Sequence, residues 1–250
     1  MTTVGKKHGP GVRSIGSVTA ACCWLIFGAT FAVPASAGSL KVNPVRINLP
    51  AGSQSVSLKI TNGEAAQTSV RVTTFGWTQV NGLDVYTPTS NVIVSPPIFT
   101  IPAGKTQLVR IGLRSRAGPG AYRVILEEIP EQKPANGQIQ VVLKLNLPLY
   151  LLPPVGGKSD VSWKAWRDSK GDMIVEGRNG GSLHSHVTQL YADRPAGREI
   201  LSKDMGVVLP ASARQWKIGK RSDFAVGAPL LLTVRSAAGE SQSQIVVEQR

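Results

Sequence analysis

The sequence predicts an all-β protein with two β-sandwich domains, and three observations carry this prediction. From Leu40 onward, apolar and polar residues alternate in short runs, which is the period of a strand, with almost no helical periodicity. Turn-forming pairs such as Asn81-Gly82 separate these runs about every 8–12 residues. The chain has 250 residues, which is enough for two domains that each bury a core.

Residues 1–37 are predicted to be a secretory signal peptide. Three bases precede an apolar run from Val18 to Val33, and Ala35-Ser36-Ala37 supplies an A-x-A cleavage site. The alternative, a membrane anchor, needs about 20 apolar residues, and this run is shorter. Both cysteines, Cys22 and Cys23, lie inside this segment, so the mature chain from Gly38 has no disulfide or thiol chemistry. We therefore expect export to the periplasm.

The net charge is +13, of which the bases of the signal peptide contribute +3, leaving +10 for the mature chain. Such a charge fits nucleic acids, anionic surfaces or acidic partners. An exported chain whose bases are scattered along strands, without a basic run, argues against nucleic acid. Solvated faces with a few functional bases are the expected interpretation.

The first domain, residues 38–153, is expected to form an immunoglobulin-like sandwich of seven or so strands. Pro44 predicts a kinked edge strand, and Pro96-Pro97 predicts a strand that switches or breaks, with a cis peptide as one option. The expected strands are Leu40–Leu49, Ser53–Thr61, Ser69–Gln79, Leu83–Thr87, Asn91–Ile101, Thr106–Leu113, Ala121–Ile129 and Gln138–Leu151.

The last of these strands carries a continuous apolar ridge. Successive side chains of a strand point to opposite faces, so one face would hold every odd position. These positions are Ile139, Val141, Leu143, Leu145, Leu147, Leu149 and Leu151. Pro148 cannot donate to a ladder, which predicts an edge strand. A bare edge invites aggregation, so either the protein covers this edge or covering it is the function.

The second domain, residues 154–250, is expected to be another, shorter β-sandwich. Pro153-Pro154-Val155-Gly156-Gly157 is the predicted linker. The expected strands are Val161–Trp166, Met173–Arg178, His186–Ala192, Gly206–Leu209, Arg214–Ile218, Pro229–Val234 and Ser243–Val247.

No residue pattern indicates catalysis, a cofactor or a metal. His184 and His186 could share one face of a strand, but neither a cysteine nor a carboxylate cluster accompanies them, so we expect surface polar residues. Glu127 and Glu128 are neighbours in a strand and face opposite ways, which excludes an acid/base couple. There is no G-x-S-x-G, P-loop or G-x-G-x-x-G motif.

Bases within apolar strands remain as candidates for binding: Arg46, Arg110, Arg123 and Lys144. For Arg110 and Lys144, pointing to solvent is an equally good interpretation. Arg46 and Arg123 lie near the ends of their strands, where a cleft between domains could gather them. Because a guanidinium forks onto a carboxylate, capture of a chain terminus beside an open strand edge is a suitable function.

Several motifs of the first domain, in order and spacing, resemble the periplasmic pilus-assembly chaperones of the chaperone–usher pathway, the PapD-like family. They are Asn43-Pro44-Val45-Arg46, Ile60-Thr61-Asn62, Ser95-Pro96-Pro97, Ile101-Pro102-Ala103-Gly104 with Leu108-Val109-Arg110, and Tyr122-Arg123 with Leu126-Glu127-Glu128-Ile129-Pro130. The resemblance implies a boomerang of two immunoglobulin-like domains that caps pilus subunits by lending them a strand, then delivers them to an outer-membrane usher.

The resemblance also implies roles for individual residues. Ile139, Val141, Leu143 and Leu145 would fill the groove of the subunit, and Arg46 would anchor its terminal carboxylate. Pro148 falls where well-studied members have a lysine, so Arg123 and Lys144 are the other candidate anchors. The run Leu145–Tyr150 resembles the archaic branch, whose subunits are similar to spore-coat protein U. The implied partners are pilin subunits and the usher, with no nucleic acid and no membrane after cleavage.

Two other functions remain open. A secreted immunoglobulin-like structural or adhesive pilus component would bury the ridge strand at home and carry an N-terminal extension to donate to a neighbour. We expect Gly38 to lead directly into the first strand instead. An enzyme such as a cell-wall hydrolase is the third alternative.

Overall fold

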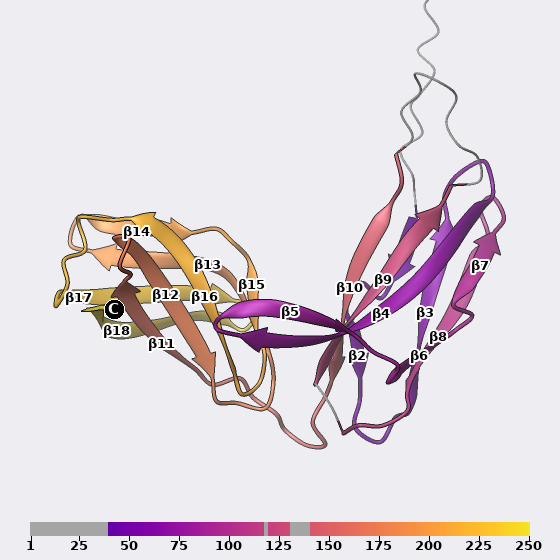
Figure 1. The fold of residues 1–250 in the computed structure, drawn as a ribbon, viewed down its shortest axis with the longest axis horizontal. Helices are drawn as coiled ribbons and strands as arrows, with labels where there is room; N and C mark the ends of the chain where they lie inside the picture. Colours follow the sequence, from indigo (N-terminus) through magenta and orange to yellow (C-terminus); the bar gives the residue numbers. More distant parts are fainter. Residues whose placement is uncertain (1–39, 118–119, 131–140) are drawn as a thin grey trace, which may run out of the picture. The chain divides into compact units, whose positions relative to one another are not determined.

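The computed structural model describes residues 40–117, 120–130 and 141–250, and the predicted signal peptide therefore lies outside the described residues. Ser36–Arg250 forms one compact unit. All regular structure in the described ranges is β-strand, as the sequence predicts (Figure 1). Within those ranges there is no helix that could span a membrane.

The N-terminal domain consists of two sheets. The first has the order β1-β3-β8-β6, and the second has the order β2-β10-β9-β4-β5, with β7 also paired to β4. The strands are β1 (Leu40–Asn43), β2 (Ile47–Leu49), β3 (Ser55–Asn62), β4 (Thr68–Val80), β5 (Leu83–Pro88), β6 (Val92–Ser95), β7 (Ile98–Ile101), β8 (Thr106–Leu113), β9 (Ala121–Ile129) and β10 (Lys144–Leu151).

Two prolines mark the points at which the chain crosses from one sheet to the other. Strand β1 pairs with β3, and after the cis bond Asn43-Pro44 the chain enters β2, which pairs with β10. Strand β6 pairs with β8, and after the cis bond Ser95-Pro96 the chain enters β7, which pairs with β4. The predicted kink at Pro44 and the predicted switch at Pro96 are therefore both confirmed.

The hairpin of β4 and β5 turns at Asn81 and Gly82, as predicted. Both residues have positive φ, 53° and 77°, which a two-residue turn between twisted strands requires. Beyond its pairing with β9, β4 continues into this hairpin, so Val80 pairs with Leu83 at the tip. The N–H of Gln215 in the C-terminal domain donates to the carbonyl of Gly82, so the hairpin tip contacts that domain.

The core of the N-terminal domain lies between its two sheets and includes half of the ridge. Leu147 and Leu149 are buried in it together with Tyr122, while Leu145 and Leu151 pack against it partly buried. The other buried members are Ile47, Leu49, Leu58, Ile60, Val70, Val72, Val92, Ile101, Val109, Ile111, Val124 and Leu126. The final segment, from Leu147, thus packs within its own domain, as predicted.

The C-terminal domain is a second sandwich in which β18 joins the two layers. Strand β18 pairs with β17 through Val246 and then, from Val247, runs parallel to β11. The order is β14-β13-β17-β18-β11-β12-β16, with β15 paired to β13. The strands are β11 (Val161–Arg167), β12 (Asp172–Asn179), β13 (Ser185–Arg194), β14 (Gly197–Ser202), β15 (Gly206–Val208), β16 (Ser212–Lys220), β17 (Pro229–Ser236) and β18 (Gly239–Gln249).

One strand of this domain, β14, is not predicted by the sequence pattern. Its sequence Gly-Arg-Glu-Ile-Leu-Ser has no alternating apolar row, and β14 is formed by pairing with β13 across the turn at Pro195 and Ala196. The other strands lie where the pattern predicts them, within a few residues at each end. The domain boundary between residues 153 and 154 stays a prediction.

Candidate functional site

Strand β10 has a free edge along most of its length. It pairs antiparallel with β9 from Lys144 to Tyr150, whereas β2 covers its other side only at Leu149–Leu151. Figure 1 shows β2 beside the last part of β10. Among the described residues, no strand pairs with the second side of Lys144–Pro148. We call this five-residue segment the open edge.

The direction of the backbone groups explains why Pro148 is compatible with a paired strand. The N–H of Glu128 donates to the carbonyl of Leu143 at 3.0 Å, so residue 143 faces β9. Because hydrogen-bonding direction alternates along an antiparallel pair, Lys144, Asn146 and Pro148 direct their backbone groups to the open edge. The N–H that Pro148 lacks would thus have faced outward, so the ladder with β9 keeps all its hydrogen bonds at this position.

The first half of the ridge differs from the prediction in its structure. The predicted strand begins at Gln138, but the observed strand begins at Lys144. Ile139 lies outside the described residues. The N–H of Leu143 donates to the side-chain carboxylate of Glu128 at 3.3 Å. Among the described residues, no second strand pairs with the other side of the chain at this point. The side chain of Val141 is 81% exposed, and its role in filling a groove stays a prediction.

Arg46 and Arg123 lie on opposite sides of Pro148. Arg123 is the direct partner of Pro148 on β9. Ile47 pairs with Leu149 in the parallel register of β2, so Arg46 comes one step earlier, beside Pro148 at the end of the open edge. Arg46 is exposed, and it directly precedes Ile47, the residue at which β2 begins to cover β10.

Aromatic rings hold the guanidinium of Arg123 in place. It lies 3.8 Å from the ring centre of Trp77 and 5.6 Å from that of Tyr86, and Nη2 donates to the Tyr86 hydroxyl at 3.5 Å. Such cation–π contacts stabilise a desolvated cation. Its Nε is buried without a hydrogen-bond partner among the described residues. The group is therefore fixed in position while part of its donor capacity is unused.

Lys144 is not brought together with the two arginines. It lies four residues before Pro148, about 13 Å along the strand. Its ammonium is 3.9 Å from Oε1 of Glu127, its direct partner on β9, and both side chains are largely exposed. An exposed pair of this kind contributes little to stability. The role of Lys144 as an anchor stays a prediction that this position does not favour.

Tyr150, at the end of β10, connects the arginines to a pair of histidines that were expected to be surface residues. His184 stacks on the tyrosine ring, with centres 3.6 Å apart and planes at 11°. His186 meets the same ring edge-on, and its Nε2 is 3.4 Å from the tyrosine hydroxyl. Both histidines are half-buried, so the expectation of ordinary surface residues is wrong. The contact spans more than 30 residues, which no local pattern indicates.

The electrostatics of this cluster keep its titratable groups neutral at pH 7. Burial raises the pKa of Tyr150 to about 12, although the charges of Arg123 and Arg46 act in the opposite direction. Burial lowers the pKa of His184 to about 4, assisted by His186 and Arg46. Burial also lowers the pKa of His186 to about 4, assisted by Arg46 and Arg123. Both arginines therefore act on Tyr150 and His186, and Arg46 also acts on His184.

The tip of the β4–β5 hairpin fixes this cluster against the C-terminal domain. The side-chain amide of Gln79 donates to the carbonyl of Val207 at 2.7 Å and accepts from the N–H of Leu209 at 3.0 Å. The hydrogen bond from Gln215 to Gly82 is 3.0 Å long. A Cβ at Gly82 would lie 2.4 Å from the Gln215 side chain, so this approach requires glycine. Trp77, Ala121, Tyr150 and Leu209 form a small buried cluster at this contact.

Asp84 on β5 is a charged part of the same contact. Its carboxylate accepts hydrogen bonds from Trp77 at 2.9 Å, Gln79 at 2.8 Å and Arg214 at 2.5 Å. Burial raises the pKa of Asp84, but the hydrogen bonds from Gln79, Trp77 and Arg214 outweigh burial and hold it below its usual range. The ion pair with Arg214 joins the two domains beside the Arg123 guanidinium.

His186 lines two hollows. The Arg46 hollow, of about 320 Å³, is lined by Arg46, Asn48, Leu152, Ser159, Leu183, His184, Ser185, His186, Ser236, Ala237 and Ala238. The Arg123 hollow, of about 260 Å³, is lined by Trp77, Asp84, Arg123, His186, Val187, Thr188, Met205, Gly206, Val207 and Arg214. The two hollows differ in charge because the second contains the carboxylate of Asp84.

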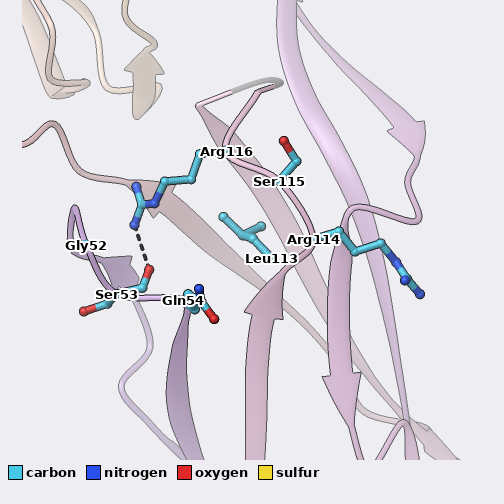
Figure 2. A pocket seen from close by; sticks show the side chains of 7 residues that line it. All are labelled: Gly52, Ser53, Gln54, Leu113, Arg114, Ser115 and Arg116. Atoms are coloured by element: carbon cyan, nitrogen blue, oxygen red, sulfur yellow. Dashed lines mark hydrogen bonds between the residues drawn. The ribbon is translucent and has the colours of Figure 1, made fainter.

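A third hollow, of about 350 Å³, lies between the loops that follow β2 and β8 (Figure 2). The two cations that line it, Arg114 and Arg116, both donate hydrogen bonds to backbone carbonyls of the protein itself. Arg116 donates to the carbonyls of Pro50 and Ser53, the latter at 3.0 Å, and Arg114 donates to the carbonyl of Ser90 at 3.0 Å. These contacts assign both arginines to loop structure. Among the described residues, no group of three His, Cys, Asp or Glu side chains could hold a metal.

Comparison with known proteins gives a family match for the N-terminal part. Residues 39–155 match the family described as pili and flagellar-assembly chaperone, PapD N-terminal domain. No curated protein is significantly similar in sequence.

Solved structures give the fold of the whole described chain. The CsuC–CsuE chaperone–tip adhesion subunit pre-assembly complex from the archaic chaperone-usher Csu pili of Acinetobacter baumannii matches with a TM-score of 0.65 and 18% identity, covering 85% of this chain and 100% of that chain. The SafA pilin–SafB chaperone complex of Salmonella enterica matches at 0.58 and 15%, covering 84% and 97%. The E. coli chaperone DraB matches at 0.54 and 17%, covering 84% and 98%. These similarities establish two immunoglobulin-like domains.

Proposed function

We propose that this chain is a periplasmic chaperone for pilus subunits, because residues 39–155 match the family of the PapD N-terminal domain. It would bind a subunit along the open edge of β10, cap it, and deliver it to an outer-membrane usher. The family and the fold are those of non-enzymatic chaperones, and we extend this to an absence of catalysis in this chain. The family match and the predicted signal peptide support the periplasm as the proposed location.

The observation that carries the proposal is that the open edge ends at Arg46. Main-chain groups of Lys144 and Asn146 face outward, and they offer hydrogen bonds to an added strand. Strand β2 blocks further pairing beyond Pro148, so an added strand must end there. A strand whose C-terminal carboxylate binds at that point runs parallel to β10. A guanidinium is the side chain best suited to such a carboxylate.

The apolar part of the interaction would come from the first half of the ridge. Val141 is 81% exposed and Leu143 is partly exposed, so neither is fully used by the chaperone's own core. A subunit that lacks a strand has an apolar groove of matching period, because strand side chains alternate between faces. Ile139, Val141, Leu143 and Leu145 are the proposed groove-filling residues, and Arg46 with Arg123 is the proposed anchor.

The test is co-expression with a pilin gene encoded beside this one, followed by measurement of the captured complex. We expect Val141→Asp to reduce capture at least tenfold, because it would place a charge in an apolar groove while lying outside the chaperone's own core. A Leu143→Asp, Leu145→Asp double variant should abolish capture. Leu108→Asp is the matched control, since Leu108 is an exposed apolar residue on β8, in the other sheet.

Undiminished capture by Val141→Asp, with an unchanged unfolding curve, would rule out donation of this strand. The alternative is a structural or adhesive pilus component, which would be found in assembled fibres. Fractionation separates the two functions, because a chaperone stays in the periplasm and is absent from sheared fibres.

A further inference from the structure

The Arg46 hollow has the composition of an anion site, whereas the Arg123 hollow does not. Of the described residues that line the Arg46 hollow, none is acidic. Arg46, His184 and His186 supply a cation and two imidazoles, and Asn48 supplies an amide. The Arg123 hollow contains Asp84, whose carboxylate repels an anion even though Arg214 pairs with it. A carboxylate is therefore directed to the Arg46 side of Tyr150.

The histidine pair is placed to respond to such a carboxylate. The charged groups that face it are Arg46 from the β1–β2 connection and Arg123 from β9. Tyr150 of β10 contacts both rings, and the charges of Asp84 and Tyr86 of β5 act on Tyr150. In the free protein, burial first and the neighbouring cations second hold the imidazoles in the neutral form.

We propose that His184 and His186 complete the carboxylate-binding site beside Arg46, and that a carboxylate enters this hollow together with a proton that the histidine pair takes up. This inference rests on the proposed function, since a subunit's C-terminus is the carboxylate intended. It adds two residues of the C-terminal domain to a site otherwise formed by the N-terminal domain. Both domains would then contact the end of the bound chain.

The sign of the effect follows from electrostatics. A carboxylate near the imidazoles favours their charged form, so their pKa is higher in the complex than in the free protein. The complex therefore binds more protons than its separate components between the free and the bound pKa values. By linkage, the affinity increases as the pH falls through that window.

The test uses a small carboxylate probe and the histidine signals of the purified chain in NMR. N-acetyl-L-phenylalanine has a free carboxylate, and N-acetyl-L-phenylalaninamide is its neutral match. The sequence has three histidines, and single His184→Gln and His186→Gln variants assign the two that matter. With the acid present, we expect at least one of the two titrations to move upward from about 4 by about one pH unit. By linkage, the affinity for the acid should then be about twofold higher at pH 5 than at pH 8.

The amide should leave both titrations unchanged, and Arg46→Gln should abolish the response to the acid. No movement with the acid, or equal movement with the amide, would overturn the proposal. The readout does not depend on pilin capture. If the histidine titrations respond to the acid but the chain captures no pilin, the carboxylate site is retained and the chaperone function is rejected. If the chain captures pilin but the titrations do not respond to the acid, the histidine site alone is rejected.

Discussion

The two ends of strand β10 differ in what covers them. From Leu149 onward, β10 lies between β9 and β2, and Leu149 is fully buried. From Lys144 to Pro148, only β9 pairs with it in the described structure, and Val141 just before it is exposed. The apolar row is therefore buried at its end and exposed just before the strand begins. Its end stabilises the domain, and its beginning is the part that we propose to bind another chain.

The largest effect should come from truncating the buried end. We expect Leu149→Ala to lower the free energy of unfolding by about 2–5 kcal/mol, because it removes buried methyl groups and leaves a cavity. Urea denaturation of this variant and of Val141→Ala would make the comparison directly. Val141→Ala should change stability by no more than about 0.5 kcal/mol, as exposed positions do. Equal losses in the two variants would contradict the division of the strand.

The next effect concerns binding rather than folding. Arg46→Ala should weaken pilin capture by about 10- to 100-fold, because a hydrogen bond to a charged group contributes about 1.5–3 kcal/mol. Arg123→Ala should also weaken capture, but it removes the guanidinium from the ring of Trp77 and should lower stability too. Arg110→Ala on β8 is the control base. Normal rescue by Arg46→Ala would remove that residue from the site.

A smaller loss is expected from altering one backbone donor on the open edge. Asn146→Pro removes an N–H that faces outward, as Pro148 already does, so the ladder with β9 should be retained. Capture should fall by about threefold to tenfold, the contribution of one hydrogen bond of about 0.5–1.5 kcal/mol. Leu147→Pro, one residue further, should instead break the ladder and unfold the domain. Comparison of the two melting curves tests the assigned direction of the backbone groups.

The smallest effect should be a pH dependence of stability at the histidine pair, whose rings are only half-buried. Burial lowers the pKa of His184 and His186 to about 4 in the folded chain, against an ordinary value near 6.5. The unfolded chain then binds more protons between pH 6.5 and 4, so this contribution to stability is complete above pH 6.5 and is lost as the pH falls toward 4. Thermal melts of a His184→Gln, His186→Gln variant should show a flatter dependence in that window. An unchanged slope would contradict the assignment.

Local patterns predict the strands well because the constraint that forms them is local. Alternation locates β3, β4, β8 and β9, and the prolines at 44 and 96 locate the crossings between sheets. Strand β14 is not predicted, since its pairing with β13 replaces the apolar alternation it lacks.

The candidate site is predictable only where it lies on strands. Arg46 and Arg123 are expected as a pair and lie on either side of Pro148, which their strand registers explain. Lys144 is a candidate as a base on the ridge strand and through the family resemblance, and it lies beside Glu127 instead. The histidines contact Tyr150 across the domain junction, and the Asp84–Arg214 pair spans 130 residues. Contacts at such separations leave no periodic trace in the sequence.

Pro148 has a further consequence, which concerns length. The open edge is closed at one end by β2 and contains five residues, Lys144–Pro148, about 17 Å of strand. Because Pro148 can accept but not donate, the last hydrogen bond donated to a guest strand comes from Asn146. A guest that ends one residue too early leaves Arg46 without its carboxylate, and one that ends one residue too late meets β2. If the proposed function holds, the fixed length of the open edge would select partner strands by the position of their C-terminus.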